Sequence, residues 1–251
     1  LLEEVLQIVY TCANEKERLL AQDVLTKFKE HPEAWTRVDT ILAKAQRQET
    51  KFFALQVLQP VIQYHWKALP RTQCDGIRNF IVENVIKLSS SEESLRQQRL
   101  FLQKLNDTLV KVIKKDWPHN WSNFISEIVS ASKTNESICE NNMIILKMLS
   151  EEIFDFSEGK MTVANTNKLK QQFNSEFAMI YQLCEMVLIN SQKPQLLIVA
   201  LDALLGFLSW IPIGYIFETK MIELLTNRFM PEPAFRNAAV KCLTEIGSIK
   251  I

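Results

Sequence analysis

The sequence predicts an all-α protein, a right-handed α-solenoid of stacked helix pairs, and three observations support this. Glycine is rare, with 5 in 251 residues beside 8 prolines, which disfavours all-β folds and glycine-loop nucleotide folds. Apolar residues recur at spacings of three and four along most of the chain, as on one face of an α-helix. Helix pairs recur at steps of 31 to 51 residues, around the roughly 40 to 47 residues of HEAT-type repeats.

The first two pairs begin near Leu1 and Pro32. The second helix of the first pair is expected from Glu15 to Glu30, and that of the second pair from Thr50 to Trp66. An apolar stripe should fix the 15–30 helix to its neighbours. The residues of that stripe are Leu20, Ala21, Val24, Leu25 and Phe28.

The next two pairs begin near Pro70 and Trp117, and a helix from Glu92 to Lys115 completes the third pair. Pro32, Pro70 and Pro118 each precede an apolar stripe, so each is expected in the first turn of a helix, where its missing N–H costs nothing. After Pro118 the stripe is Trp121, Phe124, Ile125, Ile128 and Val129.

The last two pairs are expected to begin near Lys168 and Pro212, with residues 157–167 as a long loop between helices. The apolar run 196–217 reads as buried helices instead of a membrane span, because Asp202 and Pro212 interrupt it. Residues 1–251 are thus expected to form one continuous solenoid segment of about six HEAT-type (ARM/HEAT-like) repeats. Since the helical pattern runs to the last residues, we expect a longer array.

The net charge of zero conceals a basic band. Residues 44–120 hold 13 Lys+Arg and 7 Asp+Glu, whereas the flanking segments are acidic. Such a band is typical of a partner-binding surface or of an ordinary solvated one, and nucleic-acid binding is less favoured because such domains are usually more strongly basic.

No pattern indicates catalysis or cofactor binding. The five cysteines stand far apart without a CxxC pair, which predicts buried thiols in a reducing compartment. His31, His65 and His119 are isolated, and the acidic group at 151, 152 and 155 lacks a His or Cys partner, so it reads as a solvated helix end. We therefore expect no enzyme activity, no metal and no cofactor.

Several strings resemble the N-terminal region of the exportin-1 family, within the importin-β (karyopherin) superfamily. They run in the same order over the whole chain. The strings are HPEAWTRVDTIL (31–42), DWPHNW (116–121), SEEIFDFS (150–157), WIPIGYIFETK (210–220), FRN (235–237) and KCLTEI (241–246).

This resemblance implies the N-terminal, Ran-binding segment of a nuclear export receptor. It implies an importin-β N-terminal-like region at about 15–90 and an exportin N-terminal-like region at about 90–230. The implied partners are RanGTP, nucleoporins, and cargo with leucine-rich signals bound through later repeats outside this chain; no membrane or direct nucleic-acid binding is implied. The receptor would shuttle between nucleus and cytoplasm through the nuclear pore. A generic HEAT-repeat scaffold and an RNA-carrying exportin stay open as alternatives.

In the family, the second helices of the first repeats meet Ran. On the 50–66 helix, Gln56, Gln59 and Gln63 fall three and four apart, opposite the apolar stripe. The residues expected to contact Ran are Gln22, Lys29, Gln56, Gln59, Gln63, Lys67, Arg99, Gln103 and Lys104. Pro60, where the family is expected to have another residue, should kink this helix near residues 56–59.

Overall fold

The computed structural model describes residues 1–154, 174–211 and 213–249. Every regular element among these residues is a helix, arranged in pairs as HEAT-type repeats require, so the predicted fold class is confirmed. The chain forms two compact units. Unit 1 comprises residues 1–88 and 93–115, and unit 2 comprises 89–92 and 116–251. The prediction of one continuous six-repeat solenoid stays a prediction.

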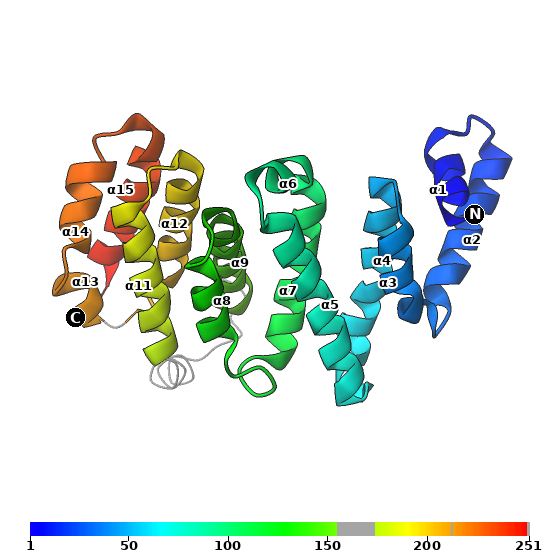
Figure 1. Cartoon of the computed structure of the whole chain (residues 1–251), viewed down its shortest axis with the longest axis horizontal. Coiled ribbons are helices and arrows are strands. Elements are labelled where there is room, and N and C mark those ends of the chain that lie inside the picture. The colour runs from blue at the N-terminus through cyan, green and yellow to red at the C-terminus, as the bar shows by residue number, and fades with distance from the viewer. Residues whose placement is uncertain (155–173, 212, 250–251) are drawn as a thin grey trace. The chain divides into compact units, whose positions relative to one another are not determined.

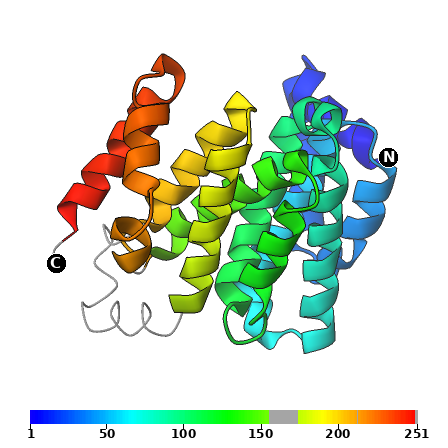
Figure 2. The same cartoon turned by 60° about the vertical axis from the view of Figure 1, so that its left-hand side comes forward.

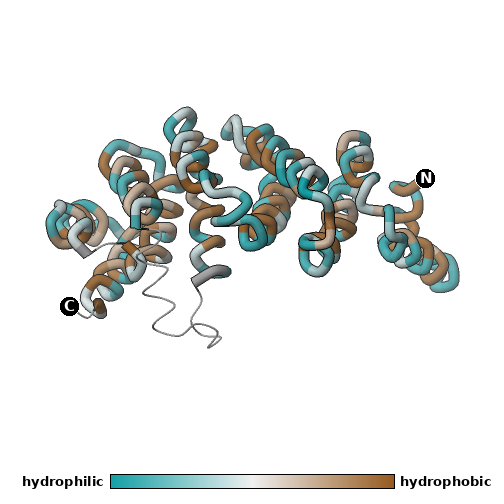
Figure 3. Tube along the Cα trace, turned by 90° about the horizontal axis from the view of Figure 1, so that it is seen from below, coloured by the Kyte–Doolittle hydropathy of each residue, from teal (hydrophilic) through white to brown (hydrophobic). Residues whose placement is uncertain are grey.

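Unit 1 consists of three helix pairs with several short irregular turns. Its elements are α1 (Leu2–Thr11), α2 (Glu15–Glu30), η1 (Ala34–Arg37), α3 (Val38–Lys44), α4 (Gln48–Pro60), η2 (Val61–His65), η3 (Trp66–Ala68), α5 (Arg71–Ser89), α6 (Glu92–Gln97) and α7 (Arg99–Asp116). Within it, α1 packs on α2, α3 packs on α4, and α1 also contacts α4. Apolar and polar residues alternate along these helices, as burial of one face demands (Figure 3).

A carboxylate of α1 supplies the cap for the start of α4. Arg47 stands at the N-cap position, but its side chain makes no capping bond. Instead, Glu3 Oε1 accepts hydrogen bonds from the backbone N–H groups of Gln46 at 2.7 Å and Arg47 at 3.1 Å. These backbone bonds hold the pKa of Glu3 below its ordinary value. An anion at a helix N-terminus is also favoured by the helix dipole.

The helix predicted from Thr50 to Trp66 is interrupted after Pro60, and the kink expected near residues 56–59 stays a prediction. The α-helix is regular through Pro60, and the chain then turns into the π-helix η2 and the 3₁₀ turn η3. Proline cannot donate the backbone bond that would continue the α-helical pattern at its position. The change from α-helix to π-helix comes directly after Pro60.

The predicted stripe of α2 is only partly correct. The bounds Glu15–Glu30 are confirmed, and Ala21 and Leu25 are buried. Leu20 and Val24, however, are 68% and 52% exposed. The helix contacts α1 and η1 on one side, and no neighbour within the described part of unit 1 covers the side with these two residues.

Two further expectations need correction. The helix predicted from Glu92 to Lys115 is broken at Gln98 into α6 and α7. Pro118 does not start a helix: it follows Trp117 through a cis peptide bond in a turn, and the helix begins at Phe124. The stripe from Phe124 to Val129 is nonetheless buried as expected.

Unit 2 has two layers of helices. Its elements are α8 (Phe124–Ser132), α9 (Glu136–Phe154), α11 (Asn174–Asn190), α12 (Pro194–Phe207), α13 (Ile213–Phe217), α14 (Met221–Leu224), η5 (Leu225–Phe229) and α15 (Pro233–Ser248). In one layer α8 contacts α11; in the other α9, α12 and α15 pack in sequence. Helices α11 and α12 stand side by side in both views (Figure 1, Figure 2).

The second layer of unit 2 is close-packed. A Cβ at Gly206 of α12 would collide with the side chain of Ser150 on α9, so the small residue allows the two helices to approach. Asp202, the single charge of the apolar run, pairs with Lys147 of α9 at 3.3 Å. No described helix is long and apolar enough to cross a membrane. The expected helix starts at Lys168 and Pro212 and the loop 157–167 lie outside the described residues.

Candidate protein-binding surface

The residues predicted to contact a partner all lie in unit 1, on α2, on α4 with its continuation η2 and η3, and on α7. We call their exposed sides the second-helix surface. Gln22, Lys29, Gln56, Gln63, Lys67, Arg99 and Gln103 are exposed, while Gln59 and Lys104 are half-buried. The sequence pattern therefore identified seven exposed positions of the nine.

Two contacts connect α4 and its continuation η2 to α7. Near their starts, the rings of Phe52 and Phe101 meet edge to face with centroids 6.1 Å apart. Beyond the end of α4, Lys115 Nζ of α7 donates a hydrogen bond to the backbone carbonyl of Gln63 at 3.0 Å. The ammonium group thus satisfies a carbonyl in the irregular turn that follows Pro60.

The exposed side of α4 does not continue as the regular ladder that was predicted. Gln56 and Gln59 share a face of the α-helix, but Gln63 lies in the π-helix and Lys67 in the 3₁₀ turn, so the spacing of three and four no longer fixes their direction. Beside Gln63, Tyr64 is 72% exposed. Tyr64 is not among the predicted contact residues, because the prediction rested on a continuous α-helix through this position.

The exposed side of α7 is basic and internally paired. Asp107 accepts hydrogen bonds from Lys104 Nζ and Lys111 Nζ, each at 3.0 Å. Burial alone would raise the pKa of Asp107, but the two ammonium groups outweigh it and lower that pKa. The ammonium group of Lys104 is therefore already paired with a carboxylate of its own helix. Asp107 and Lys111 also belong to the surface, although they are not among the predicted contact residues.

Aromatic contacts join α2 to α4. The rings of Phe28 and Phe53 lie 5.9 Å apart, and Lys29 Nζ stands 5.9 Å from the centre of the Phe53 ring. All three helices that carry the predicted residues are thus connected by contacts within unit 1. Their exposed groups are mainly amides and ammonium ions, which can donate hydrogen bonds to carbonyl and carboxylate oxygens of a protein partner.

A groove on the other helices of unit 1 was not anticipated from the sequence. It has a volume of about 360 Å³ and lies between η1 with α3 and the first half of α5. Trp35, Val38, Ile77 and Phe80 give it an apolar lining. Gly76 also lines it, and no atom lies within 4 Å of the position that a Cβ of Gly76 would occupy. Nothing in the spacing of these residues signals a groove, because each one also fits the apolar stripe of its helix.

Two features of the described residues bear on metal binding and on thiol reactivity. The described residues contain no group of three or more His, Cys, Asp or Glu side chains that could hold a metal ion. Burial raises the pKa of the Cys139 thiol to about 11 and that of Cys242 to about 12, and it raises that of Cys184 as well. These thiols are therefore protonated and poor nucleophiles at neutral pH.

The chain is similar to known proteins over nearly its whole length. It is 53% identical to Exportin-1 of Drosophila melanogaster and 53% identical to Exportin-1 of Schizosaccharomyces pombe, each over 249 residues, or 99% of this chain. It is 47% identical to Protein EXPORTIN 1B of Arabidopsis thaliana over 249 residues. In each case the match covers 23% of the relative, so the chain spans about a quarter of the length of these proteins.

Two family models match consecutive parts of the chain. Residues 21–87 match the importin-beta N-terminal domain, and residues 98–243, more than half the chain, match the exportin 1-like proteins. The resemblance inferred from the sequence strings is thereby confirmed. Together with the paired helices of both units, these matches show that the chain belongs to the exportin 1-like family of the importin-β superfamily.

Proposed function

We propose that this chain is the N-terminal, Ran-binding segment of a nuclear export receptor that carries cargo with leucine-rich signals out of the nucleus together with RanGTP. The observation that supports this most directly is the position of the second-helix surface. Six of its predicted residues, from Gln22 to Lys67, fall within the match to the importin-beta N-terminal domain. The other three fall at the start of the exportin 1-like match.

The chemistry of the surface suits reversible protein binding. Exposed glutamine amides offer both a donor and an acceptor, so they can pair with a partner's backbone without a buried charge. The lysines and Arg99 add attraction to acidic groups, which mainly increases the association rate. In this proposal the chain itself performs no catalysis, and GTP hydrolysis belongs to Ran.

The remaining partners belong to the same proposal. Cargo signals are bound by repeats outside this chain, and nucleoporins guide the receptor through the nuclear pore as it shuttles between nucleus and cytoplasm. The apolar groove of unit 1, with Trp35 and Phe80 in its wall, is the feature of that unit best suited to hold an apolar nucleoporin side chain. Full-length receptor is the appropriate material for testing these partners.

The decisive experiment compares two triple substitutions in this chain. Replacing Gln56, Gln59 and Gln63 by alanine should weaken binding to RanGTP at least tenfold in a titration calorimeter, with helix content unchanged by circular dichroism. A matched control replaces three exposed glutamines of unit 2, Gln182, Gln192 and Gln195, and should retain the parent affinity. Equal affinities for the two variants, or no preference for the GTP form of Ran in the parent chain, would refute the proposal.

The basic side of α7 favours one alternative, an RNA-carrying exportin, enough to test it. Lys104, Lys111 and Arg99 lie on this side. Phosphate contacts make RNA affinity fall steeply with salt. A strong loss of affinity for a double-stranded RNA between 50 and 200 mM salt, abolished by Lys111→Gln with Arg99→Gln, would support that alternative. Binding to neither RNA nor RanGTP would instead favour a generic HEAT-repeat scaffold.

A further inference from the structure

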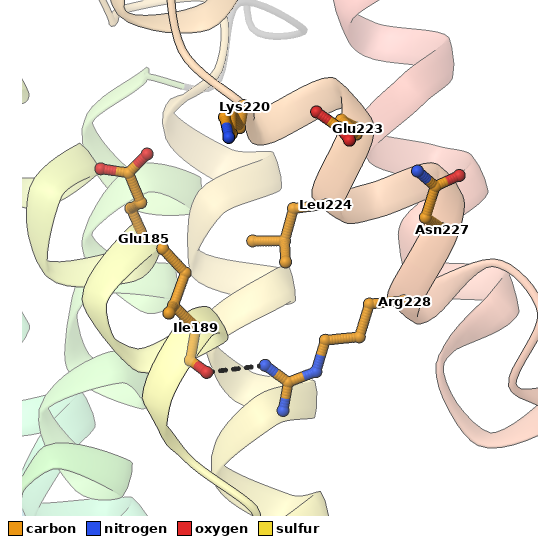
Figure 4. Close-up of a pocket in the computed structure, with 7 residues that line it drawn as sticks. All are labelled: Glu185, Ile189, Lys220, Glu223, Leu224, Asn227 and Arg228. Atoms are coloured by element: carbon orange, nitrogen blue, oxygen red, sulfur yellow. Dashed lines mark hydrogen bonds between the residues drawn. The ribbon is translucent and has the colours of Figure 1, made fainter.

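Unit 2 contains a groove between α11 and the segment formed by α14 and η5 (Figure 4). It has a volume of about 360 Å³, within the range of sites that accept a small ligand or a peptide side chain. The residues that line it are Glu185, Ile189, Lys220, Glu223, Leu224, Asn227 and Arg228. This groove belongs to unit 2, whereas the second-helix surface belongs to unit 1, and the groove is not needed for the proposed Ran binding.

The middle of the groove is apolar. Ile189 of α11 is 52% exposed although it is a large aliphatic residue, and Leu224 of α14 is half-buried. Both side chains line the same hollow, from opposite walls (Figure 4). An aliphatic side chain placed between them would remove apolar surface of both residues from water, which is favourable.

Arg228 closes one end of the groove and is not available to a ligand. Its guanidinium donates hydrogen bonds to three backbone carbonyls at the end of α11, those of Leu188, Ile189 at 2.8 Å and Ser191 at 2.9 Å. The bond to Ile189 is the dashed line in Figure 4. Because these carbonyls end a helix, the cation also complements the dipole of α11. Arg228 therefore holds the end of α11 in place, and its guanidinium donors are already used by these carbonyls.

The opposite end carries three charged side chains, those of Glu185, Glu223 and Lys220. Glu185 Oε1 lies 3.5 Å from the hydroxyl of Tyr181, and no described residue forms an ion pair within 4 Å of Glu223 or Lys220. Two carboxylates face one ammonium ion there, which gives this end a net negative charge.

A hydrogen-bonded residue holds the charged end in place. Thr219 Oγ1 donates to the carbonyl of Tyr215 at 2.7 Å and lies 2.5 Å from the hydroxyl of Tyr181, which also lies 3.5 Å from Glu185 Oε1. Thr219 Oγ1 also accepts the backbone N–H of Met221 at 3.3 Å. Thr219 thereby anchors both sides of Lys220, and the backbone at the mouth of the groove is positioned before any ligand arrives.

From this arrangement we propose that the groove binds a short peptide segment of a partner protein, with a bulky aliphatic side chain followed by lysine or arginine. The aliphatic side chain fits between Ile189 and Leu224. The cationic side chain reaches Glu185 and Glu223, whose two carboxylates outnumber the one ammonium group of Lys220 at this end. An acidic neighbour in its place would meet two carboxylates and is disfavoured.

The test uses three dye-labelled octapeptides and the complete 251-residue chain, with binding followed by fluorescence anisotropy. The basic peptide is Gly-Ser-Leu-Leu-Lys-Arg-Ser-Gly, and the other two carry Ser-Ser or Glu-Glu in place of Lys-Arg. We expect saturable binding of the basic peptide, at least tenfold tighter than that of the acidic one, with the neutral peptide between them. Absence of saturable binding, or equal binding of all three peptides, would overturn the proposal.

Two variants locate the binding. Ile189→Glu should weaken binding of the basic peptide at least tenfold, whereas Val240→Glu, at a residue of α15 that is 43% exposed, serves as the matched control and should not. Glu223 is exposed, so Glu223→Lys should fold normally and shift the preference toward the acidic peptide by at least tenfold. An unchanged charge preference in Glu223→Lys, or full binding by Ile189→Glu with native helix content, would contradict the site.

Discussion

Two second helices, α2 of unit 1 and α12 of unit 2, bury very different shares of their residues. In unit 1, α2 buries only Ala21 and Leu25 and exposes Leu20 and Val24. In unit 2, α12 buries seven of its fourteen residues, and Leu201 and Leu204 are completely inaccessible. Helix α2 thus offers exposed side chains for contacts, whereas half of α12 is packed inside unit 2; α4 of unit 1, with six of its thirteen residues buried, resembles α12 in this respect. The difference predicts that substitutions in unit 2 cost stability and that those on the surface of unit 1 mainly change binding.

The largest contrast is expected from truncating one leucine in each helix. Leu204→Ala in α12 should lower the free energy of unfolding by about 2–5 kcal/mol, because it leaves a cavity in a close-packed layer. Leu20→Ala in α2, at a residue 68% exposed, should change it by no more than about 0.5 kcal/mol. Urea unfolding followed by circular dichroism measures both. A cost above about 2 kcal/mol for Leu20→Ala would mean that α2 is covered in solution.

Two glycine-to-alanine substitutions should change the stability of the fold in opposite directions. Gly206→Ala places a Cβ against Ser150 between α12 and α9, and should destabilise by about 1–3 kcal/mol through overpacking. Gly76→Ala in α5, where no atom lies within 4 Å of the added Cβ, should stabilise by about 0.4–1 kcal/mol because alanine favours the helix. Thermal unfolding of both variants measures these changes in stability. Stabilisation by Gly206→Ala would show that α9 and α12 are less close than described.

A smaller, pH-dependent effect is expected at Glu3. The pKa of its carboxylate is lowered in the folded chain by the backbone bonds of Arg47 and Gln46. Its contribution to stability is therefore present above the unfolded pKa of about 4.3 and is lost as the pH falls through the folded value. Glu3→Gln should lower the melting temperature at pH 7, and the difference from the parent should shrink below about pH 4. A difference that does not depend on pH would show that the charge of Glu3 is not what caps α4.

Much of the helix pattern could be predicted from the sequence because its signals are local. Asn14 caps α2 by accepting the N–H of Lys16 at 3.1 Å, and Pro32 follows its end, so both bounds were predictable. Whether a neighbour covers Leu20 depends on residues distant in the chain, and an amphipathic pattern does not contain that information. The same holds for the capping of α4 by Glu3, since 43 residues separate Glu3 from Gln46.

The predicted partner-contact residues were chosen correctly for exposure but not for conformation. Periodicity identified the side of α4 that faces water, because the opposite side had to be apolar. It could not show that the chain after Pro60 forms a π-helix, in which Gln63 and Tyr64 take new directions. The course of the backbone after Pro60 depends on how the helices pack. The pairing of Lys104 and Lys111 with Asp107, by contrast, has the i,i+3 and i,i+4 spacing of a local helical pattern, which the prediction did not use.

Hydrogen–deuterium exchange of the chain with and without RanGTP tests the proposed role of unit 1 most directly. Binding by the second-helix surface predicts slower exchange in α4, in η2 and in α7 from Arg99 to Lys111, with little change in α12 and α15, and no effect of RanGDP at the same concentration. Protection confined to the helices of unit 2, or equal protection by both nucleotide forms of Ran, would contradict the assignment of this surface.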